Sequence, residues 1–80
     1  MVDIRYFAAI ADAIGKDREI LDFPVHATIA DLRTTLAESY GPDLDKMLAV
    51  CAYLIGDELT RDPSVALTPR VDVLPPFAGG

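Results

Sequence analysis

The last six residues carry the clearest chemical pattern in the sequence. Proline cannot extend a central β-ladder, so two adjacent prolines end a sheet and project the residues after them away from it. Six extended residues at about 3.1 Å each reach roughly 18 Å. Gly79 and Gly80 lack Cβ atoms and leave a terminal carboxyl sterically open. We expect Gly80 to present this carboxylate on a flexible tail that enters another protein's pocket; the tail reads Pro75-Pro76-Phe77-Ala78-Gly79-Gly80.

A carboxylate in this position has a definite chemistry. It is ionised at neutral pH and can attack the α-phosphate of a nucleotide, which gives an acyl-adenylate and turns an inert group into an acylating agent. An ordinary frayed chain end is the alternative interpretation. The combination of stiff prolines, one aromatic anchor at Phe77 and small residues after it favours a functional tail.

The remainder of the sequence contains no recognisable catalytic set. His26 stands alone and is interpreted as a surface or capping histidine. Cys51 lies in an apolar run, which favours a buried thiol over a reactive one. The carboxylates are scattered, so we expect a solvated acidic surface and no metal site. The body of the domain is predicted to lack an active site of its own.

Composition limits the classes of function. The chain has 80 residues, 51% hydrophobic and 25% charged, which suits one small globular domain. A net charge of -6 argues against binding nucleic acid and serves solubility or attraction to basic partners. A single cysteine fits a reducing, cytoplasmic setting. No signal segment and no membrane span is expected.

Hydrophobic periodicity predicts an alternation of strands and helices. Residues 2–8 and 18–23 alternate in polarity as strands do, and residues 9–14 suit a short helix that ends at Gly15. Thr28 is a candidate cap for the main helix, which should run to Tyr40.

The second half of the sequence predicts mostly strands. Residues 42–48 suit one further helical turn, 49–55 a buried strand and 71–74 a last strand. Gly56-Asp57 marks a hairpin turn that returns on a short strand at Leu59, and residues 61–68 form a loop.

This order predicts an α+β fold of the β-grasp, ubiquitin-like kind. A mixed sheet of four to five strands would grip one main helix, with the first and last strands side by side in the middle. A ferredoxin-like split βαβ is the competitor, but it needs a second long helix after Ile55. We expect residues 1–75 to form the domain and residues 76–80 to form the extended tail.

The sequence resembles the small, sulfur-carrying subunits of molybdopterin synthase, the MoaD type of the ubiquitin-like sulfur carriers. The resemblance covers essentially the full length, from the opening residues 2–8 through Gly15 and the helix at 28–36 to the ending at 74–80, which is its most specific part.

The resemblance implies a complete reaction scheme. An E1-like adenylyltransferase would use ATP and magnesium to adenylate Gly80, and a persulfide from a sulfurtransferase would convert it to a thiocarboxylate (1-thioglycine). The large catalytic subunit would then receive the tail and pass its sulfur to cyclic pyranopterin monophosphate, in a complex of two large and two small subunits. The domain itself would bind no cofactor and act as the sulfur-donating co-substrate.

Family analogy also suggests partner contacts. Phe7 and the apolar exit from the last strand, Leu74 to Phe77, would pack on the large subunit, with a second core face as the alternative for Phe7. The chain departs from many relatives at Ala11 and Asp12, where they have a basic residue that docks the activating enzyme. Two other functions remain open: a sulfur carrier for thiazole formation in thiamine synthesis or another pathway, and a ubiquitin-like protein modifier.

Overall fold

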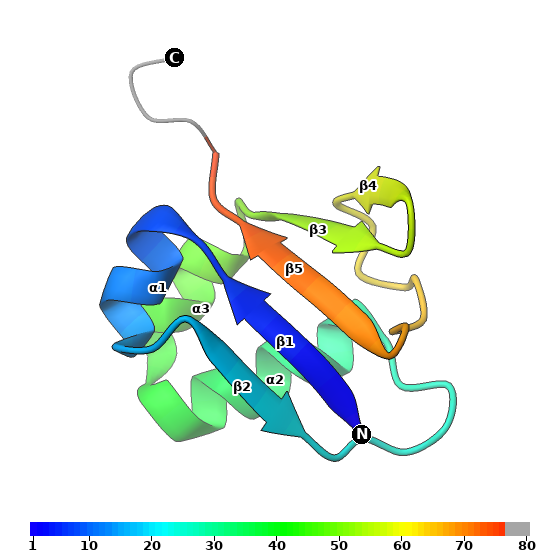
Figure 1. The fold of residues 1–80 in the computed structure, drawn as a ribbon. Helices are drawn as coiled ribbons and strands as arrows, with labels where there is room; N and C mark the ends of the chain where they lie inside the picture. The colour runs from blue at the N-terminus through cyan, green and yellow to red at the C-terminus, as the bar shows by residue number, and fades with distance from the viewer. Residues whose placement is uncertain (77–80) are drawn as a thin grey trace.

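The computed structural model describes residues 1–76. Five strands and three helices alternate along the chain (Figure 1). In order they are β1 (Val2–Tyr6), α1 (Ala8–Ile14), β2 (Arg18–Leu21), α2 (Ile29–Tyr40), α3 (Pro42–Leu48), β3 (Ala52–Ile55), β4 (Glu58–Thr60) and β5 (Arg70–Leu74).

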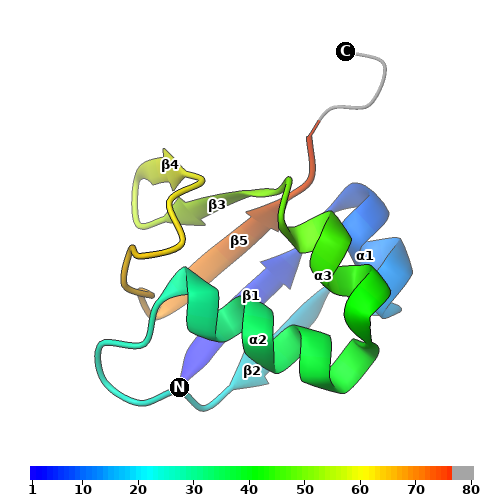
Figure 2. The same ribbon diagram turned by 180° about the vertical axis from the view of Figure 1, so that it is seen from behind.

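The five strands form one mixed sheet in the order β2-β1-β5-β3-β4. β1 and β5 are parallel and lie in the middle, whereas every other neighbouring pair is antiparallel. Helices α2 and α3 cover one face of this sheet, and α1 packs beside α3 near the end of β1 (Figure 2). The predicted β-grasp arrangement is therefore confirmed, including the central pairing of the first and last strands.

The local sequence explains how α1 ends. Gly15 has φ 86°, in the left-handed region that glycine adopts without a Cβ penalty, and its N–H donates to the carbonyl of Ala11 at 2.8 Å. The helix starts at Ala8, one residue before the predicted start, because Phe7 already has the extended backbone of a cap residue. The first strand accordingly stops at Tyr6 rather than at residue 8.

The main helix, α2, begins with a reciprocal cap. The backbone N–H of Thr28 donates to Asp31 Oδ2 at 2.8 Å, and the N–H of Asp31 donates to Thr28 Oγ1 at 3.4 Å. Two N–H groups that the first turn would leave without partners are thus satisfied. The predicted cap and helix are confirmed from Thr28 to Tyr40.

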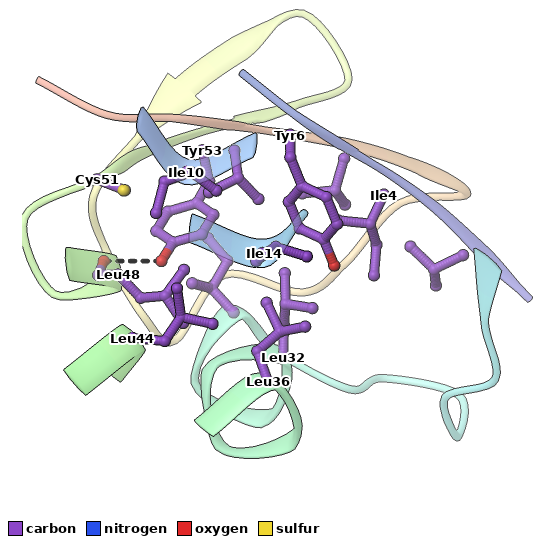
Figure 3. Packing of buried hydrophobic residues seen from close by; sticks show 14 of the residues in the cluster. Ile4, Tyr6, Ile10, Ile14, Leu32, Leu36, Leu44, Leu48, Cys51 and Tyr53 are labelled. Atoms are coloured by element: carbon purple, nitrogen blue, oxygen red, sulfur yellow. Dashed lines mark hydrogen bonds between the residues drawn. The ribbon is translucent and has the colours of Figure 1, made fainter. Parts of the chain in front are cut away.

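The core lies between the sheet and the helices (Figure 3). Alternate residues of β1 and β5 point into it, and Ile4, Val71 and Val73 are completely buried. The buried hydroxyl of Tyr53 donates to the carbonyl of Leu48 at 2.8 Å, which joins β3 to the end of α3. The other buried members of the cluster are Val2, Tyr6, Ile10, Ile14, Ile29, Leu32, Leu36, Leu44, Cys51 and Ile55.

Three further strand boundaries differ from those that the sequence predicts, and the smallest difference is at β5, which begins at Arg70 instead of residue 71. The second strand ends at Leu21 instead of residue 23, ahead of Pro24, and the strand predicted from residue 49 begins at Ala52. Residues 49–51 close the end of α3 instead, because the N–H groups of Val50 and Cys51 donate to the carbonyls of Met47 and Leu48. Of these three residues Cys51 is buried, whereas Ala49 and Val50 are exposed, so the apolar run does not mark a buried strand.

The segment at residues 42–48 is a seven-residue helix, longer than the single turn predicted. Within residues 1–76 no helix follows Ile55, which excludes the ferredoxin-like alternative for this part of the chain. No helix among these residues is long and apolar enough to cross a membrane. The predicted boundary at residue 75 stays a prediction, and residues 77–80 lie outside the described part of the chain.

Replacing Thr28 by alanine should lower the free energy of unfolding by about 1 kcal/mol, because the first turn of α2 loses its side-chain acceptor. Urea unfolding followed by circular dichroism measures this change. Thr34→Ala, on the exposed side of the same helix, is the matched control and should be neutral or slightly stabilising. Equal losses in both variants would contradict the role of the cap.

Candidate functional site

The parallel pairing of β1 and β5 brings two distant segments to the same end of the sheet. Tyr6 and Val73 are cross-strand partners, so Phe7 and Leu74 follow them side by side. Leu74 is also paired with Ala52 at the start of β3. At this end the chain leaves β5, on the opposite side of the molecule from the N-terminus (Figure 1).

A mainly apolar hollow lies where the chain leaves the sheet. Phe7 is 40% exposed and Leu59 is 60% exposed, although both are large hydrophobic side chains. Arg61 is the charged residue in its wall. We call this site the exit hollow; its walls are Phe7, Ala8, Ala9, Ala52, Leu59, Arg61, Leu74, Pro75 and Pro76. Exposed apolar side chains gathered at one place are typical of a surface that binds another molecule.

The backbone at the rim of the exit hollow is strained. Ala8 has φ 51°, in the left-handed region that costs a residue with a Cβ atom roughly 1–2 kcal/mol. This conformation turns the chain from β1 into α1 directly after Phe7. Strain of this kind tends to occur where a protein positions groups for function.

Beside the exit hollow, the sheet face that points away from the helices carries a network of opposite charges. Asp3 accepts hydrogen bonds from Arg18 Nε at 2.8 Å and from an Arg5 guanidinium nitrogen at 3.2 Å. The bond from Arg18, together with that from Arg5, lowers the pKa of Asp3 below its ordinary value. Arg70 binds Asp72 through two nitrogens, at 3.1 and 3.4 Å. We call this surface the open face.

The interior groups that could react are held in unreactive forms. Cys51 is 2% exposed, its thiol donates to the carbonyl of Met47 at 3.2 Å, and burial raises its pKa. The prediction of a buried thiol is confirmed. Burial also raises the pKa of Tyr6 and Tyr53. His26 is exposed, as predicted, in the loop before α2.

Among residues 1–76, no three histidine, cysteine, aspartate or glutamate side chains lie close enough together to hold a metal ion. The exit hollow is our candidate site in the described part of the chain, because its exposed apolar side chains are of the kind found on binding surfaces.

The structure brings together four of the residues singled out in the sequence. Phe7, Leu74, Pro75 and Pro76 all line the exit hollow. The other predicted site residues, Phe77, Ala78, Gly79 and Gly80, lie outside the described part of the chain.

Sequence reasoning missed five members of this site, namely Ala8, Ala9, Ala52, Leu59 and Arg61. Leu59 could have been found from the sequence. It is an apolar residue between Glu58 and Thr60 on an edge strand, so it should either pack in the core or bind another molecule. The pairing of Leu54 with Leu59 places both on the open face. Ala52 and Arg61 occupy the next position in the register of the β3–β4 hairpin, after the pair of Tyr53 and Thr60. The sequence gave no signal for their place in this site, because that depends on the long-range pairing of β3 with β5.

Known proteins give a consistent set of similarities. No family model matches the sequence. The molybdopterin synthase sulfur carrier subunit of Caenorhabditis elegans is 29% identical, and the alignment covers 99% of this chain and 96% of that protein.

Two solved structures are similar over nearly their whole length. SAMP1 from Haloferax volcanii superposes with a TM-score of 0.74 at 20% identity, covering 99% of this chain and 98% of that one. A complex of subunits 1 and 2 of molybdopterin-converting factor from Helicobacter pylori contains a chain that superposes with a TM-score of 0.65 at 26% identity, covering 99% and 97%.

The sheet order and the main helix thus define a ubiquitin-like β-grasp protein, with an exposed apolar hollow where β5 ends. Within that class, the chain is similar along its full length to the sulfur carrier subunits of molybdopterin synthase, as the sequence predicts.

The strain at Ala8 can be tested with a pair of glycine variants. Ala8→Gly should leave the free energy of unfolding unchanged or raise it, because the penalty for a positive φ is removed. Ala9→Gly, one residue further along and also exposed, should lower it by about 0.5–1 kcal/mol, since glycine weakens an ordinary helical position. Urea denaturation compares the two, and equal losses would contradict a strained Ala8.

Proposed function

We propose that this chain is the sulfur carrier subunit of a molybdopterin synthase and works through a thiocarboxylate on Gly80. The full-length similarity to a molybdopterin synthase sulfur carrier subunit is the observation that carries the proposal. The interior of the domain agrees with it, because its one thiol is buried and the described residues hold no metal cluster. The reacting group is then supplied by the tail.

The proposed loading occurs in three steps. A carboxylate oxygen of Gly80 attacks the α-phosphate of ATP, and pyrophosphate leaves, which produces the glycyl adenylate. A persulfide sulfur of a donor protein then attacks the acyl carbon and displaces AMP. A thiol of the donor attacks the resulting S–S bond, so that the donor keeps a disulfide and Gly80 keeps a thiocarboxylate. ATP and magnesium belong to the activating adenylyltransferase, and the carrier supplies only the acyl group.

The exit hollow is the proposed docking surface for the catalytic large subunit. The solved Helicobacter pylori neighbour is a complex of two subunits of molybdopterin-converting factor, which supports a second subunit as the partner of this chain. Phe7, Leu59 and Leu74 would bury apolar surface on that subunit. Docking beside the end of β5 directs the tail into the partner's active site, where its sulfur passes to cyclic pyranopterin monophosphate. Tethering raises the effective concentration of sulfur at the acceptor.

Mass spectrometry tests the proposed chemistry. Incubation with the activating enzyme, ATP and a sulfur donor should raise the mass of the intact protein by the difference between sulfur and oxygen. A variant without Gly80 keeps the same β-grasp domain, but its carboxylate ends about 3 Å short, so it should stay unloaded. Restoration of molybdopterin synthesis by this variant would overturn the proposal. Glycine-glycine remnants on cellular lysines, without any thiocarboxylate, would indicate a protein modifier instead.

The docking surface has an independent test. Leu59→Asp should weaken binding to the large subunit by about 2 kcal/mol, or roughly 30-fold, because a charge would have to be desolvated in the contact. Val25→Asp is the matched control, since Val25 is 84% exposed and lies at the other end of the domain, and it should bind normally. Calorimetry measures both affinities. Equal binding by the two variants would contradict docking at the exit hollow and leave the sulfur chemistry standing.

A further inference from the structure

β2 is the outer strand on one side of the sheet, and its outward edge has backbone groups available for pairing. The N–H of Tyr6 donates to the carbonyl of Asp17. Because backbone groups of successive strand residues point to opposite sides, this bond shows which residues of β2 face β1. Glu19 and Leu21 direct their backbone polar groups toward β1. The N–H and C=O groups of Arg18 and Ile20 therefore point away from the sheet.

The side chains along this edge are self-complementary. Ile20 is 50% exposed and lies on the open face, as does Arg18, two residues before it. Asp22 follows two residues after Ile20, and its side chain is 89% exposed. If a second copy pairs antiparallel with Ile20 opposite Ile20, each Arg18 lies opposite the partner copy's Asp22. One symmetric arrangement then joins two apolar side chains and forms two ion pairs.

The contacts that Arg18 and Asp22 already make within one copy leave both free to form ion pairs with a second copy. Arg18 binds Asp3 through Nε, and a guanidinium group has further N–H donors that can bind a second carboxylate. Asp22 lies 3.9 Å from the N-terminal amine of Met1, with both groups largely exposed, so this ion pair contributes little.

The strand is also well anchored for pairing. On its inner side, Glu19 accepts hydrogen bonds from the hydroxyl groups of Tyr6 at 2.8 Å and Tyr40 at 3.0 Å. These bonds tie β2 to β1 and to the end of α2, so little conformational freedom is lost when a second strand adds. The other edge strand, β4, has only three residues and places acidic Glu58 next to Leu59. It offers no comparable self-complementary pattern.

We propose that two copies of this chain associate through their β2 edges and form a continuous antiparallel sheet across a two-fold axis at Ile20. The opposing charges of Arg18 and Asp22 set the register. The exit hollow lies where β1 and β5 end and beside β3 and β4, not at the outward edge of β2, so it stays uncovered in both copies. The dimer would present two tails at once, and its existence does not depend on the proposed sulfur chemistry.

Charge-reversal variants test this dimer, and sedimentation equilibrium measures the association. The protein concentration should range from micromolar to roughly millimolar, because a short strand pair is a small interface that binds weakly. The wild type should show an average mass that rises with concentration toward that of a dimer. Asp22→Arg and Arg18→Asp should each remain monomeric, because each places like charges opposite one another. A mixture of these two variants should associate again, since every Arg then meets an Asp. Circular dichroism verifies that both variants are folded.

A control variant tests whether net charge alone changes association, and amide hydrogen exchange tests which residues are paired in the dimer. Asp57→Arg changes the net charge as Asp22→Arg does, but it lies in the exposed β3–β4 turn and should associate like the wild type. Amide hydrogen exchange should show protection of Arg18 and Ile20 that increases with concentration, while Glu19 and Leu21 remain constant. A wild type that stays monomeric at millimolar concentration, or a mixture that fails to associate, would overturn the proposal.

Discussion

The parallel pairing of β1 with β5 is the constraint on which the remaining structure depends. It joins the first and last strands of the described chain in the centre of the sheet, with Ile4 opposite Val71 and both completely buried. Because parallel strands end at the same edge, the residue after β1 and the residues after β5 become neighbours. The exit hollow, and the direction in which the chain leaves it, depend on this one pairing.

The two faces of the sheet serve different purposes. The covered face holds a continuous apolar core, and its buried thiol and tyrosine hydroxyls have little chemical reactivity. The open face carries fixed charges, with Asp3 held ionised between two arginines. A domain with an apolar rim and a charged face is suited to presenting a segment to other proteins, as the proposed function requires.

Patterns of short range allowed most of the fold to be predicted. Thr28 and Asp31 identify the start of α2, and the alternation around Ile4 identifies β1, because capping and strand burial depend on adjacent residues. The strand prediction for residues 49–51 was wrong, since helix ends and buried strands are equally apolar. The place of Arg61 in the exit hollow could not be predicted, because the pairing of β3 with β5 joins segments about 20 residues apart and leaves no local pattern.

The central place of β5 has a consequence for biosynthesis. Before β5 is made, the sheet consists of two separate hairpin-like pairs, β1 with β2 and β3 with β4. Two-stranded pairs are marginal in water, so a growing chain on the ribosome cannot complete its fold until residue 74 has emerged. The residues of the tail come immediately afterwards. A chain that terminates before β5 is complete would therefore remain unfolded and be degraded, and partner proteins would not meet it as a folded domain.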